Sequence, residues 1–237
     1  MSRPLLPLDS IDLGLMPYAA AFERQTTELQ RVLESRDTQE PILGRLLLVE
    51  HPPVITVSNR PGAGEHLLAS PAALADKGVA LERTDRGGDI TYHGPGQIVL
   101  YPILDLNRLA LGLHDYMRLL EQVVIDTLAR FGVTGERDKG ATGVWINAGP
   151  PGPAKVAAMG VRVRRWVSMH GLSLNVDPQM DHYDLIVPCG LVGRRVTSMR
   201  EILGAACPSI TQVRSILVDS MRTRIQEALA AATAKRS

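Results

Sequence analysis

Cys189 stands in the segment 186–191, where Pro188 precedes it and Gly190 follows it. A Pro/Gly pair predicts a turn of the chain, and a turn can direct a thiol side chain into a cleft. Because a thiolate is a strong nucleophile, Cys189 is a candidate for covalent catalysis. The alternative is a buried core thiol, which is the commoner fate of cysteine. Cys207 has no glycine beside it, and we expect it to be structural.

Lys155 lies in the stretch 154–160, among small apolar residues. Arginine supplies most of the positive charge, because among 26 Lys and Arg residues the only lysines are Lys77, Lys139, Lys155 and Lys235. A partly buried lysine can lose its proton near neutral pH, whereas an arginine cannot. We therefore interpret Lys155 as a candidate acid–base group. The alternative is an exposed lysine at the edge of a strand.

A glycine-rich segment, RGGDITYHGPGQ, occupies residues 86–97. Its glycines would allow the backbone to approach a ligand closely, and the alternative is a tight hairpin between two strands. The segment lacks the GK[ST] of a P-loop and the pattern of a dinucleotide-binding loop. Thr91, Tyr92 and His93 are candidates for polar groups at the mouth of a pocket. His93 and His170 each lie near a glycine, but the roles of both histidines stay open.

The elements that must position these residues are helices and strands in mixed order. Apolar residues at helical spacing predict helices over 15–35, 71–77, 114–131 and 209–232. Apolar and β-branched runs predict strands over 45–50, 54–57, 79–84, 98–104, 143–147, 154–163 and 167–175. Ser209 and Gln212 fit a capping box at the start of the last helix. The order predicts an α+β fold, with a mixed, largely antiparallel sheet flanked by helices.

The length of 237 residues suits a single catalytic domain over 1–237. A charged fraction of 22% and a net charge of +1 argue against a nucleic-acid-binding protein. No apolar run reaches the roughly 18 residues that span a bilayer, and the N-terminus lacks the features of a secretory signal. We therefore expect a cytoplasmic protein with free thiols and no membrane contact. The acidic residues and histidine at 177–184 form no strong metal-ligand pattern, and we expect no metal.

Several segments taken together resemble the lipoyl(octanoyl) transferase family. They are RGGDITYHGPGQ (86–97), GVW (143–145), KVAAMGVRVRRWVSMHGLSLNV (155–176) and PCGL (188–191). The resemblance covers roughly 45–200 in matching order and spacing, and its two longest segments are specific. Asp89 and the Pro/Gly-rich stretch 149–153 look like local variation on the family pattern. Residues 1–40 and the region after 205 carry little of the resemblance.

The resemblance implies the fold of the biotin and lipoate protein ligase catalytic domains. It also implies a catalytic Cys/Lys dyad, which maps onto Cys189 and Lys155. The family's substrate-binding residues map onto three stretches of this sequence. They are Arg86, Gly87, Gly88, Asp89, Ile90, Thr91, Tyr92 and His93, then Ala158, Met159 and Gly160, and finally Gly171, Leu172 and Ser173.

The activity that the resemblance implies is transfer of an octanoyl or lipoyl group to the ε-amine of a lysine, through a thioester on Cys189. This reaction is the first step of endogenous lipoate biosynthesis. The implied partners are acyl carrier protein, the lipoyl domains of 2-oxoacid dehydrogenase complexes and the glycine cleavage H protein. The acyl donor is carried on the phosphopantetheine of the carrier protein, and neither ATP nor a metal cofactor is expected. We expect a monomer.

Basic residues outnumber acidic ones between positions 155 and 200, and the excess comes mainly from arginines at 162–165 and 194–200. A local positive excess on a nearly neutral chain predicts a docking surface for an acidic partner. The alternative is an ordinary solvated face.

Other functions would use the same features differently. An ATP-dependent lipoate or biotin ligase would form an acyl-adenylate and would not need a nucleophilic cysteine, whereas the PCG turn and the GPGQ end of the glycine-rich segment favour the transferase. A non-catalytic module that binds acyl carrier protein would not need Cys189 either. A cysteine hydrolase that pairs Cys189 with His93 or His170 would release free acid.

Overall fold

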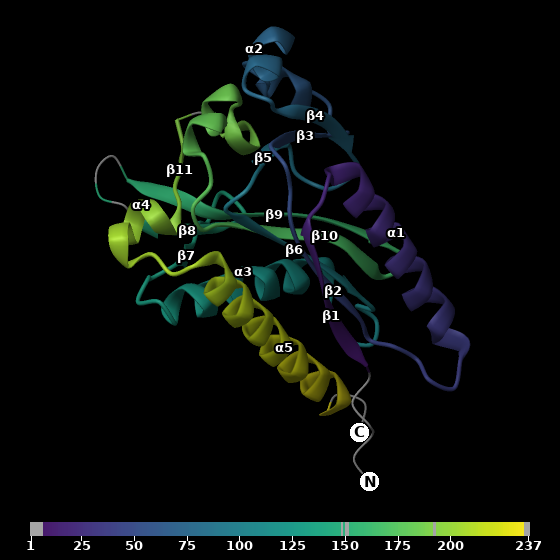
Figure 1. Ribbon diagram of the computed structural model, residues 1–237. Helices are drawn as coiled ribbons and strands as arrows, with labels where there is room; N and C mark the ends of the chain where they lie inside the picture. Colours follow the sequence, from purple (N-terminus) through teal and green to yellow (C-terminus); the bar gives the residue numbers. More distant parts are fainter. Residues whose placement is uncertain (1–6, 148, 150–151, 192, 235–237) are drawn as a thin grey trace.

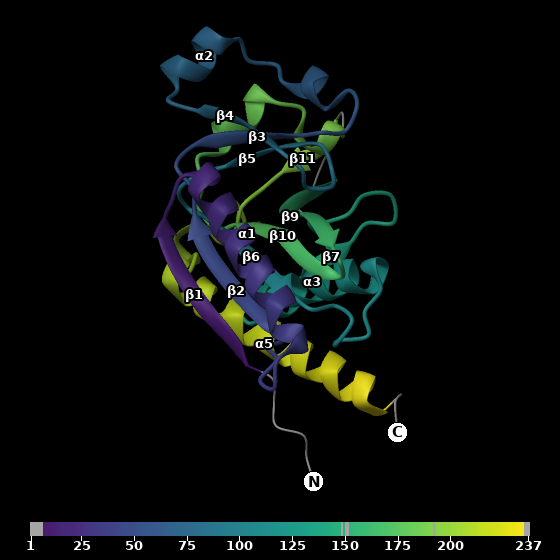
Figure 2. The same ribbon diagram turned by 90° about the vertical axis from the view of Figure 1, so that its right-hand side faces the viewer.

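The computed structural model describes residues 7–147, 149, 152–191 and 193–234. Its layers lie one above another (Figure 1). A small sheet with helix α2 (Pro71–Asp76) lies at the top, and a large sheet lies in the middle. Helices α3 (Leu113–Ala129) and α5 (Ile210–Ala234) lie beneath it, and the view turned by 90° shows the same arrangement (Figure 2).

The large sheet has eight strands within the described residues, and β11 (Arg195–Val196) joins it beside β9. The others, in order across the sheet, are β1 (Leu8–Leu15), β2 (Gly44–Glu50), β6 (Gln97–Leu104), β10 (Val167–Asn175), β9 (Pro153–Arg164), β8 (Val144–Asn147) and β7 (Glu136–Arg137). Strands β1 and β2 are parallel, as are β9 and β11, and the other neighbours are antiparallel. The predicted mixed, largely antiparallel α+β fold is confirmed.

The small sheet consists of β4 (Ala80–Thr84), β3 (Val54–Ser58) and β5 (Ile90–His93). Strand β5 belongs to this sheet, whereas β6, which follows it after Gly94–Gly96, belongs to the large one. The hairpin interpretation of the glycine-rich segment is therefore wrong, because its turn crosses from one sheet to the other. Gly96 has φ 85°, and a Cβ there would lie 2.1 Å from the carbonyl oxygen of Asp177, so this crossing requires glycine.

One face of the large sheet packs on α3 and α5. Side chains alternate along a strand, so Ile98 and Leu100 of β6 and Leu174 of β10 all point into this cluster, where each is fully buried. Burial of such a side chain stabilises the fold by about 1.5–3 kcal/mol. The predicted capping box is present at the start of α5, where the Gln212 backbone N–H donates to Ser209 Oγ at 3.3 Å and the Ser209 N–H donates to Gln212 Oε1 at 2.9 Å.

Helix α1 (Tyr18–Glu34) covers part of the opposite face, where Leu29 and Val32 pack against Val99 and Tyr101 of β6. The predicted helix over 15–35 is confirmed over Tyr18–Glu34 and is wrong only at its first residues. Leu15 is the last residue of the edge strand β1, which was not predicted from the sequence. Helix α1 begins only after Pro17.

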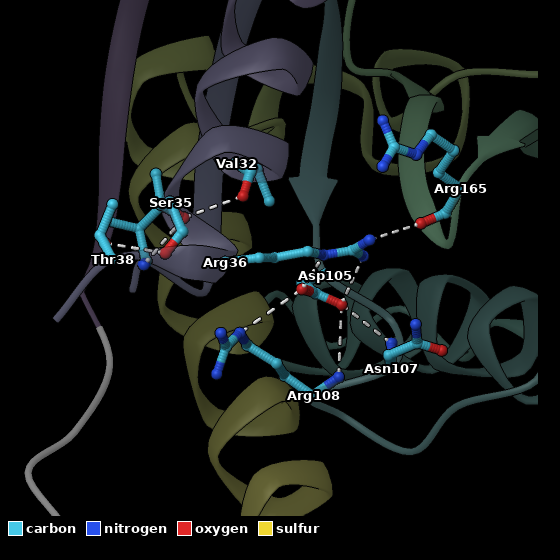
Figure 3. Close-up of polar contacts among 9 residues, drawn as sticks. Val32, Ser35, Arg36, Thr38, Asp105, Asn107, Arg108 and Arg165 are labelled. Atoms are coloured by element: carbon cyan, nitrogen blue, oxygen red, sulfur yellow. Dashed lines mark hydrogen bonds and ion pairs between the residues drawn. The ribbon is translucent and has the colours of Figure 1, made fainter. Parts of the chain in front are cut away.

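An ionic cluster ties three segments that are distant in sequence (Figure 3). The guanidinium of Arg36, after α1, donates to both carboxylate oxygens of Asp105 at 2.8 and 3.0 Å. It also donates to the carbonyl oxygen of Arg165, in the turn between β9 and β10, at 2.9 Å. Arg108 lies 3.4 Å from the same carboxylate. The cluster thus fixes the end of β6 against α1 and the β9–β10 turn.

Short helices make most of the remaining connections: η1 (Ser35–Asp37), η2 (Ala63–His66), η3 (Met180–Leu185), η4 (Pro188–Gly190), α4 (Met199–Leu203) and η5 (Gly204–Ala206). The single turn η4 contains Cys189. Across the part of the chain that the structure describes, no helix has both the length and the apolar character needed to cross a membrane.

Candidate active site

A cavity of about 250 Å³ lies between the large sheet and the glycine-rich segment. Its lining includes Cys189 and Lys155 together with most of the expected substrate-binding residues. Those residues are Arg86, Gly88, Asp89, Ile90, Thr91, His93, Ala158, Met159, Gly160, Gly171, Leu172 and Ser173. The glycine-rich segment thus meets the paired stretches 158–160 and 171–173, which are distant from it in sequence, at one cavity that also contains the cysteine and the lysine.

Small residues of the large sheet form one wall of the cavity. Gly171 and Ser173 of β10 pair with Gly160 and Ala158 of β9, and all four line the cavity. The next residue on β10, Leu174, points to the opposite face and packs beneath with α3 and α5. The alternation of the strand thus separates a filled core face from a face that leaves room for a ligand.

The glycine-rich segment rests directly on β9. The Gly87 N–H donates to the carbonyl oxygen of Val161 at 2.9 Å, and a Cβ at Gly160 would lie 2.6 Å from the carbonyl oxygen of Gly87. Any side chain at Gly160 would therefore push the two backbones apart. Gly87 itself contributes this backbone contact and is absent from the residues that line the cavity.

The amine of Lys155 donates a hydrogen bond to Cys189 Sγ at 3.2 Å. Lys155 is only 5% exposed, so the alternative of a solvent-exposed lysine at a strand edge is wrong. Gly143 leaves room for its stem, because a Cβ at that position would lie 3.1 Å from Lys155 Cε. An amine beside a thiol can stabilise the thiolate as a cation and can exchange a proton with it.

Cys189 adopts a left-handed backbone conformation, with φ 58° and ψ 14°. A residue other than glycine seldom adopts this conformation, and such residues concentrate at functional sites. The turn is held because the Val187 N–H donates to the carbonyl oxygen of His66 at 2.8 Å, and the Gly190 N–H donates to that of Val187 at 3.0 Å. The Cys189 side chain is half-buried, which agrees with the predicted turn and not with a core thiol.

Asp89 supports this turn from the glycine-rich segment. One carboxylate oxygen accepts from the Ile90 N–H at 2.8 Å and lies 2.7 Å from His66 Nδ1, and the other lies 3.4 Å from Arg60. A Cβ at Gly190 would meet the His66 ring at 2.7 Å and Asp89 Oδ2 at 3.2 Å. Asp89 therefore lines the cavity, but its carboxylate is already engaged by protein groups next to Cys189.

Arg86 spans the cavity from one sheet to the other. Its guanidinium donates to the carbonyl oxygen and the hydroxyl of Thr56 on β3 at 2.9 and 3.0 Å, while its Cδ would lie 3.2 Å from a Cβ at Gly160 on β9. Burial lowers the pKa of Arg86 from its usual value. Arg86 Nε is buried without a hydrogen-bond partner among the described residues.

The buried histidines near the cavity are held neutral. Burial lowers the pKa of His93 to about 3 and that of His170 to about 3, and burial lowers the pKa of His51 to about 4. His93 Nδ1 lies 2.6 Å from Gln97 Oε1, and His170 Nε2 lies 2.8 Å from Asp85 Oδ1. A histidine with so low a pKa is a weak proton acceptor, which disfavours a hydrolase that pairs Cys189 with either ring.

One expected substrate-binding side chain points elsewhere. Tyr92 is fully buried in the cluster that the small sheet forms with α2 and η3, where its hydroxyl lies 2.9 Å from His182 Nδ1. Other residues of the cavity lining were not predicted from the sequence, namely Tyr18, Arg60, Val99, Tyr101, Gly140, Ala141, Thr142 and Leu191. Alternation along β6 identifies Val99 and Tyr101 as a pair on one face, but no local signal marks Tyr18 or the loop at 140–142.

Cys207 lies apart from the cavity. Its side chain packs against the α3/α5 cluster, and burial raises the pKa of its thiol. A raised pKa makes a thiol less nucleophilic at neutral pH, in agreement with the predicted structural role.

The excess of positive charge that the sequence predicts becomes smaller once the ion pairs in the structure are counted. Arg162 pairs with Asp85, Arg194 with Asp138, and Arg200 with Asp177. Arg164, Arg165 and Arg195 are exposed, and a docking surface for an acidic partner stays a prediction that rests mainly on these three. Within the described residues, no group of three or more His, Cys, Asp or Glu side chains could hold a metal ion.

Comparison with known folds identifies the architecture. Over 97% of the chain, the structure resembles a bipartite lipoate protein ligase from Thermoplasma acidophilum, of which it covers 91%, with a TM-score of 0.67 and 16% identity. It also resembles a biotin protein ligase from Aquifex aeolicus in complex with biotin and ATP, with a TM-score of 0.53 and 12% identity over 92% of this chain and 71% of that one. These similarities establish the ligase-type catalytic fold.

Comparison of sequences identifies the family. Residues 17–229 match the lipoyl protein ligase A/B catalytic domain. The chain is 41% identical to an octanoyltransferase of Christiangramia forsetii over 224 residues, which is 92% of this chain and 95% of that protein. It is 46% identical to an octanoyltransferase of Gloeobacter violaceus over 219 residues, which is 92% of this chain and 88% of that protein. The chain therefore belongs to the octanoyltransferase family of enzymes.

Proposed function

We propose that this protein transfers an octanoyl group from acyl carrier protein to the ε-amine of a lysine on a lipoyl domain, through a thioester on Cys189. The observation that carries the proposal is the 3.2 Å contact between Lys155 Nζ and Cys189 Sγ in a cavity with a floor of small residues. The family relationship supports the acyl group, because the relatives are octanoyltransferases.

In the first step, the Cys189 thiolate attacks the carbonyl carbon of the acyl thioester on the carrier protein. A new carbon–sulfur bond forms, the bond to the phosphopantetheine sulfur breaks, and that sulfur leaves as a thiol after it takes up a proton. Lys155 favours the attacking thiolate while it carries a positive charge, and it is close enough to supply the proton.

In the second step, the neutral amine of the acceptor lysine attacks the thioester on Cys189. An amide bond forms, the carbon–sulfur bond breaks, and the proton of the incoming amine passes to Lys155 while Cys189 returns to the thiolate. Lys155 thus acts as the acid in the first step and as the base in the second, while Cys189 is first the nucleophile and then the leaving group. Because a thioester is more reactive than an amide, the transfer needs no ATP.

The cavity supports the acyl specificity, since Gly160, Gly171 and Ala158 leave an unfilled channel along β9 and β10. The acceptors under this proposal are lipoyl domains of 2-oxoacid dehydrogenase complexes and the glycine cleavage H protein. The reaction is the first step of endogenous lipoate synthesis, in the cytoplasm, where acyl carrier protein supplies the donor. We propose that the enzyme acts as a monomer.

Intact mass spectrometry tests the proposal. The enzyme is incubated with octanoyl-acyl carrier protein, without ATP, and should gain the mass of one octanoyl group, which moves to an added lipoyl domain. Cys189→Ala should gain none, while Cys207→Ala should behave like the unchanged enzyme. A stable octanoyl adduct on Cys189→Ala, release of free octanoate, or a requirement for ATP would each contradict the proposed route.

A further inference from the structure

The register between β8 and β9 changes beside the candidate catalytic lysine. Val144 pairs with Ala157, whereas Trp145 pairs with Lys155, so Val156 is the extra residue of a β-bulge. Without the bulge, Trp145 would pair with Val156, and Lys155 would point to the same face as Ile146 instead. A one-residue slip reverses which side chains share a face. The bulge therefore sets Trp145 and Lys155 on one face as neighbours.

The indole of Trp145 contacts several groups of the site. Trp145 is 2% exposed, and Lys155 Nζ lies 4.9 Å from the centre of its ring. The guanidinium carbon of Arg194, five residues after Cys189, lies 4.1 Å from the ring centre. Its Nε1–H donates to the carbonyl oxygen of Ala141 at 3.1 Å, in the loop that lines the cavity. One side chain thus touches the lysine, the chain beyond the nucleophile turn and the cavity wall.

The nature of these contacts suits a lysine that must gain and lose a proton. In the part of the chain that the structure describes, no carboxylate lies within ion-pair distance of Lys155, whose contacts are Cys189 Sγ and the indole. A carboxylate would hold the ammonium form strongly. An aromatic face attracts the ammonium without accepting its proton, so it fixes the position of the amine and favours its charge only modestly.

Other charged groups also lie around the indole. Arg194 places a second, permanent positive charge against the same ring. Asp138 pairs with Arg194 and holds it in place. Glu136 lies opposite Trp145 on β7 and is exposed.

We propose that Trp145 is a positioning residue for the reaction: it holds the Lys155 amine against Cys189 and couples it to the Arg194 segment that follows the nucleophile turn. This inference rests on the proposed function for the role of Lys155. The contact itself does not depend on that function and can be tested without any substrate.

Fluorescence tests the contact, because the chain has two tryptophans, Trp145 and Trp166. Trp166 is 49% exposed in the turn between β9 and β10, so Trp166→Phe leaves Trp145 as the sole emitter. Its emission should shift when iodoacetamide alkylates Cys189 in a Cys207→Ala background, because the adduct displaces the Lys155 amine from its place between the sulfur and the ring. Lys155→Met should abolish this shift. The reciprocal Trp145→Phe protein, in which Trp166 emits, should show no shift on alkylation.

Kinetics test the positioning role. Trp145→Leu removes the aromatic face and should lower kcat about tenfold with less than a threefold change in KM for the carrier protein. Trp145→Phe keeps an aromatic face and should recover most of the loss, whereas the matched control Trp166→Leu should leave kcat unchanged. Circular dichroism and the unfolding midpoint of each variant exclude simple misfolding as the cause.

Two results would overturn the inference. One is an emission from Trp145 that does not change when Cys189 is alkylated, or whose change persists in Lys155→Met. The other is a folded Trp145→Leu enzyme with normal kcat and a normal rate of Cys189 alkylation. Failure of the acyl transfer itself is seen separately, as the absence of an octanoyl adduct on Cys189 in an enzyme whose Trp145 emission still responds to alkylation of Cys189.

Discussion

The two faces of the large sheet are built from the same strands but differ in what they contain. Towards α3 and α5, strands β6 and β10 present Ile98, Leu100 and Leu174, which are fully buried in an apolar cluster. Towards the glycine-rich segment, β9 and β10 present Gly160 and Gly171 and leave a cavity. The difference indicates that the first face contributes to stability through dense packing, while the part of the other face beside the glycine-rich segment gives up packing to make room for chemistry.

The largest expected effect is on the cavity face, at Lys155. Lys155→Arg keeps a positive charge beside Cys189 and Trp145 but cannot release a proton. We expect turnover to fall on the order of 10²-fold or more in both Lys155→Arg and Lys155→Ala, which is the usual scale for loss of an acid–base group. Steady-state transfer of octanoyl from carrier protein to a lipoyl domain measures the loss. Near-normal turnover of the Arg variant would limit Lys155 to an electrostatic role.

The next effect belongs to the core face. Leu174→Ala removes a fully buried side chain beneath α3 and α5 and should lower the free energy of unfolding by about 2–5 kcal/mol. Ser173→Ala, the adjacent change on the cavity face, should alter it by less than about 0.5 kcal/mol. Urea unfolding followed by circular dichroism compares the two. If both substitutions cost the same, the faces do not divide stability from function in the way proposed.

A smaller effect is expected when the cavity is partly filled. Ala158→Val adds two methyl groups to the floor beside Ser173 and Gly160. We expect kcat/KM for octanoyl-carrier protein to fall about tenfold, with hexanoyl-carrier protein affected much less, because a clash of one or two carbons is worth roughly 10–200-fold. An equal loss for both donors would show that the acyl chain does not lie over Ala158.

The smallest effect per residue concerns pH. In the folded protein, His51, His93 and His170 stay neutral down to about pH 4, 3 and 3, whereas in the unfolded chain they bind protons below about pH 6.5. Their contribution to stability is therefore complete above pH 6.5 and is lost as the pH falls from 6.5 towards these lower values. The expected slope is roughly 1.4 kcal/mol per pH unit for each histidine.

Urea unfolding at pH 7, 6 and 5 measures that slope. His51→Gln should reduce the slope of unfolding free energy against pH by the contribution of one histidine. The control His114→Gln, at an exposed position on α3, should leave the slope unchanged. A slope that is the same in the unchanged protein and in His51→Gln would contradict the assignment of a buried neutral imidazole.

The sequence predicted the main elements and the pair at the centre of the site, because these depend on local patterns. Apolar periodicity marked α3, β9 and β10 to within a few residues, and the flanking proline and glycine marked the turn at Cys189. The strand β1 was missed because its residues are partly polar, and an edge strand depends on its neighbour for pairing.

Features that depend on distant residues could not be predicted in this way. The crossing of the chain from β5 to β6 depends on which sheet each strand joins, and a Gly-Pro-Gly turn permits either outcome. The bulge that pairs Trp145 with Lys155 depends on the register of two strands. The positive excess near 162–200 was overcounted, because Asp85 and Asp138 lie outside that stretch of sequence and pair with its arginines in space.

The ionic cluster around Arg36 has a consequence for the order in which the protein folds. Arg36 joins Asp105 across 69 residues and Arg165 across 129 residues, so each contact closes a long loop. We expect contacts of this kind to form after the strands that they join have paired, so that their loss acts mainly on the rate of unfolding. Arg36→Met should therefore unfold faster in urea while its refolding rate changes little. A slower refolding rate, measured by stopped-flow fluorescence, would instead place this cluster among the first long-range contacts that the chain makes.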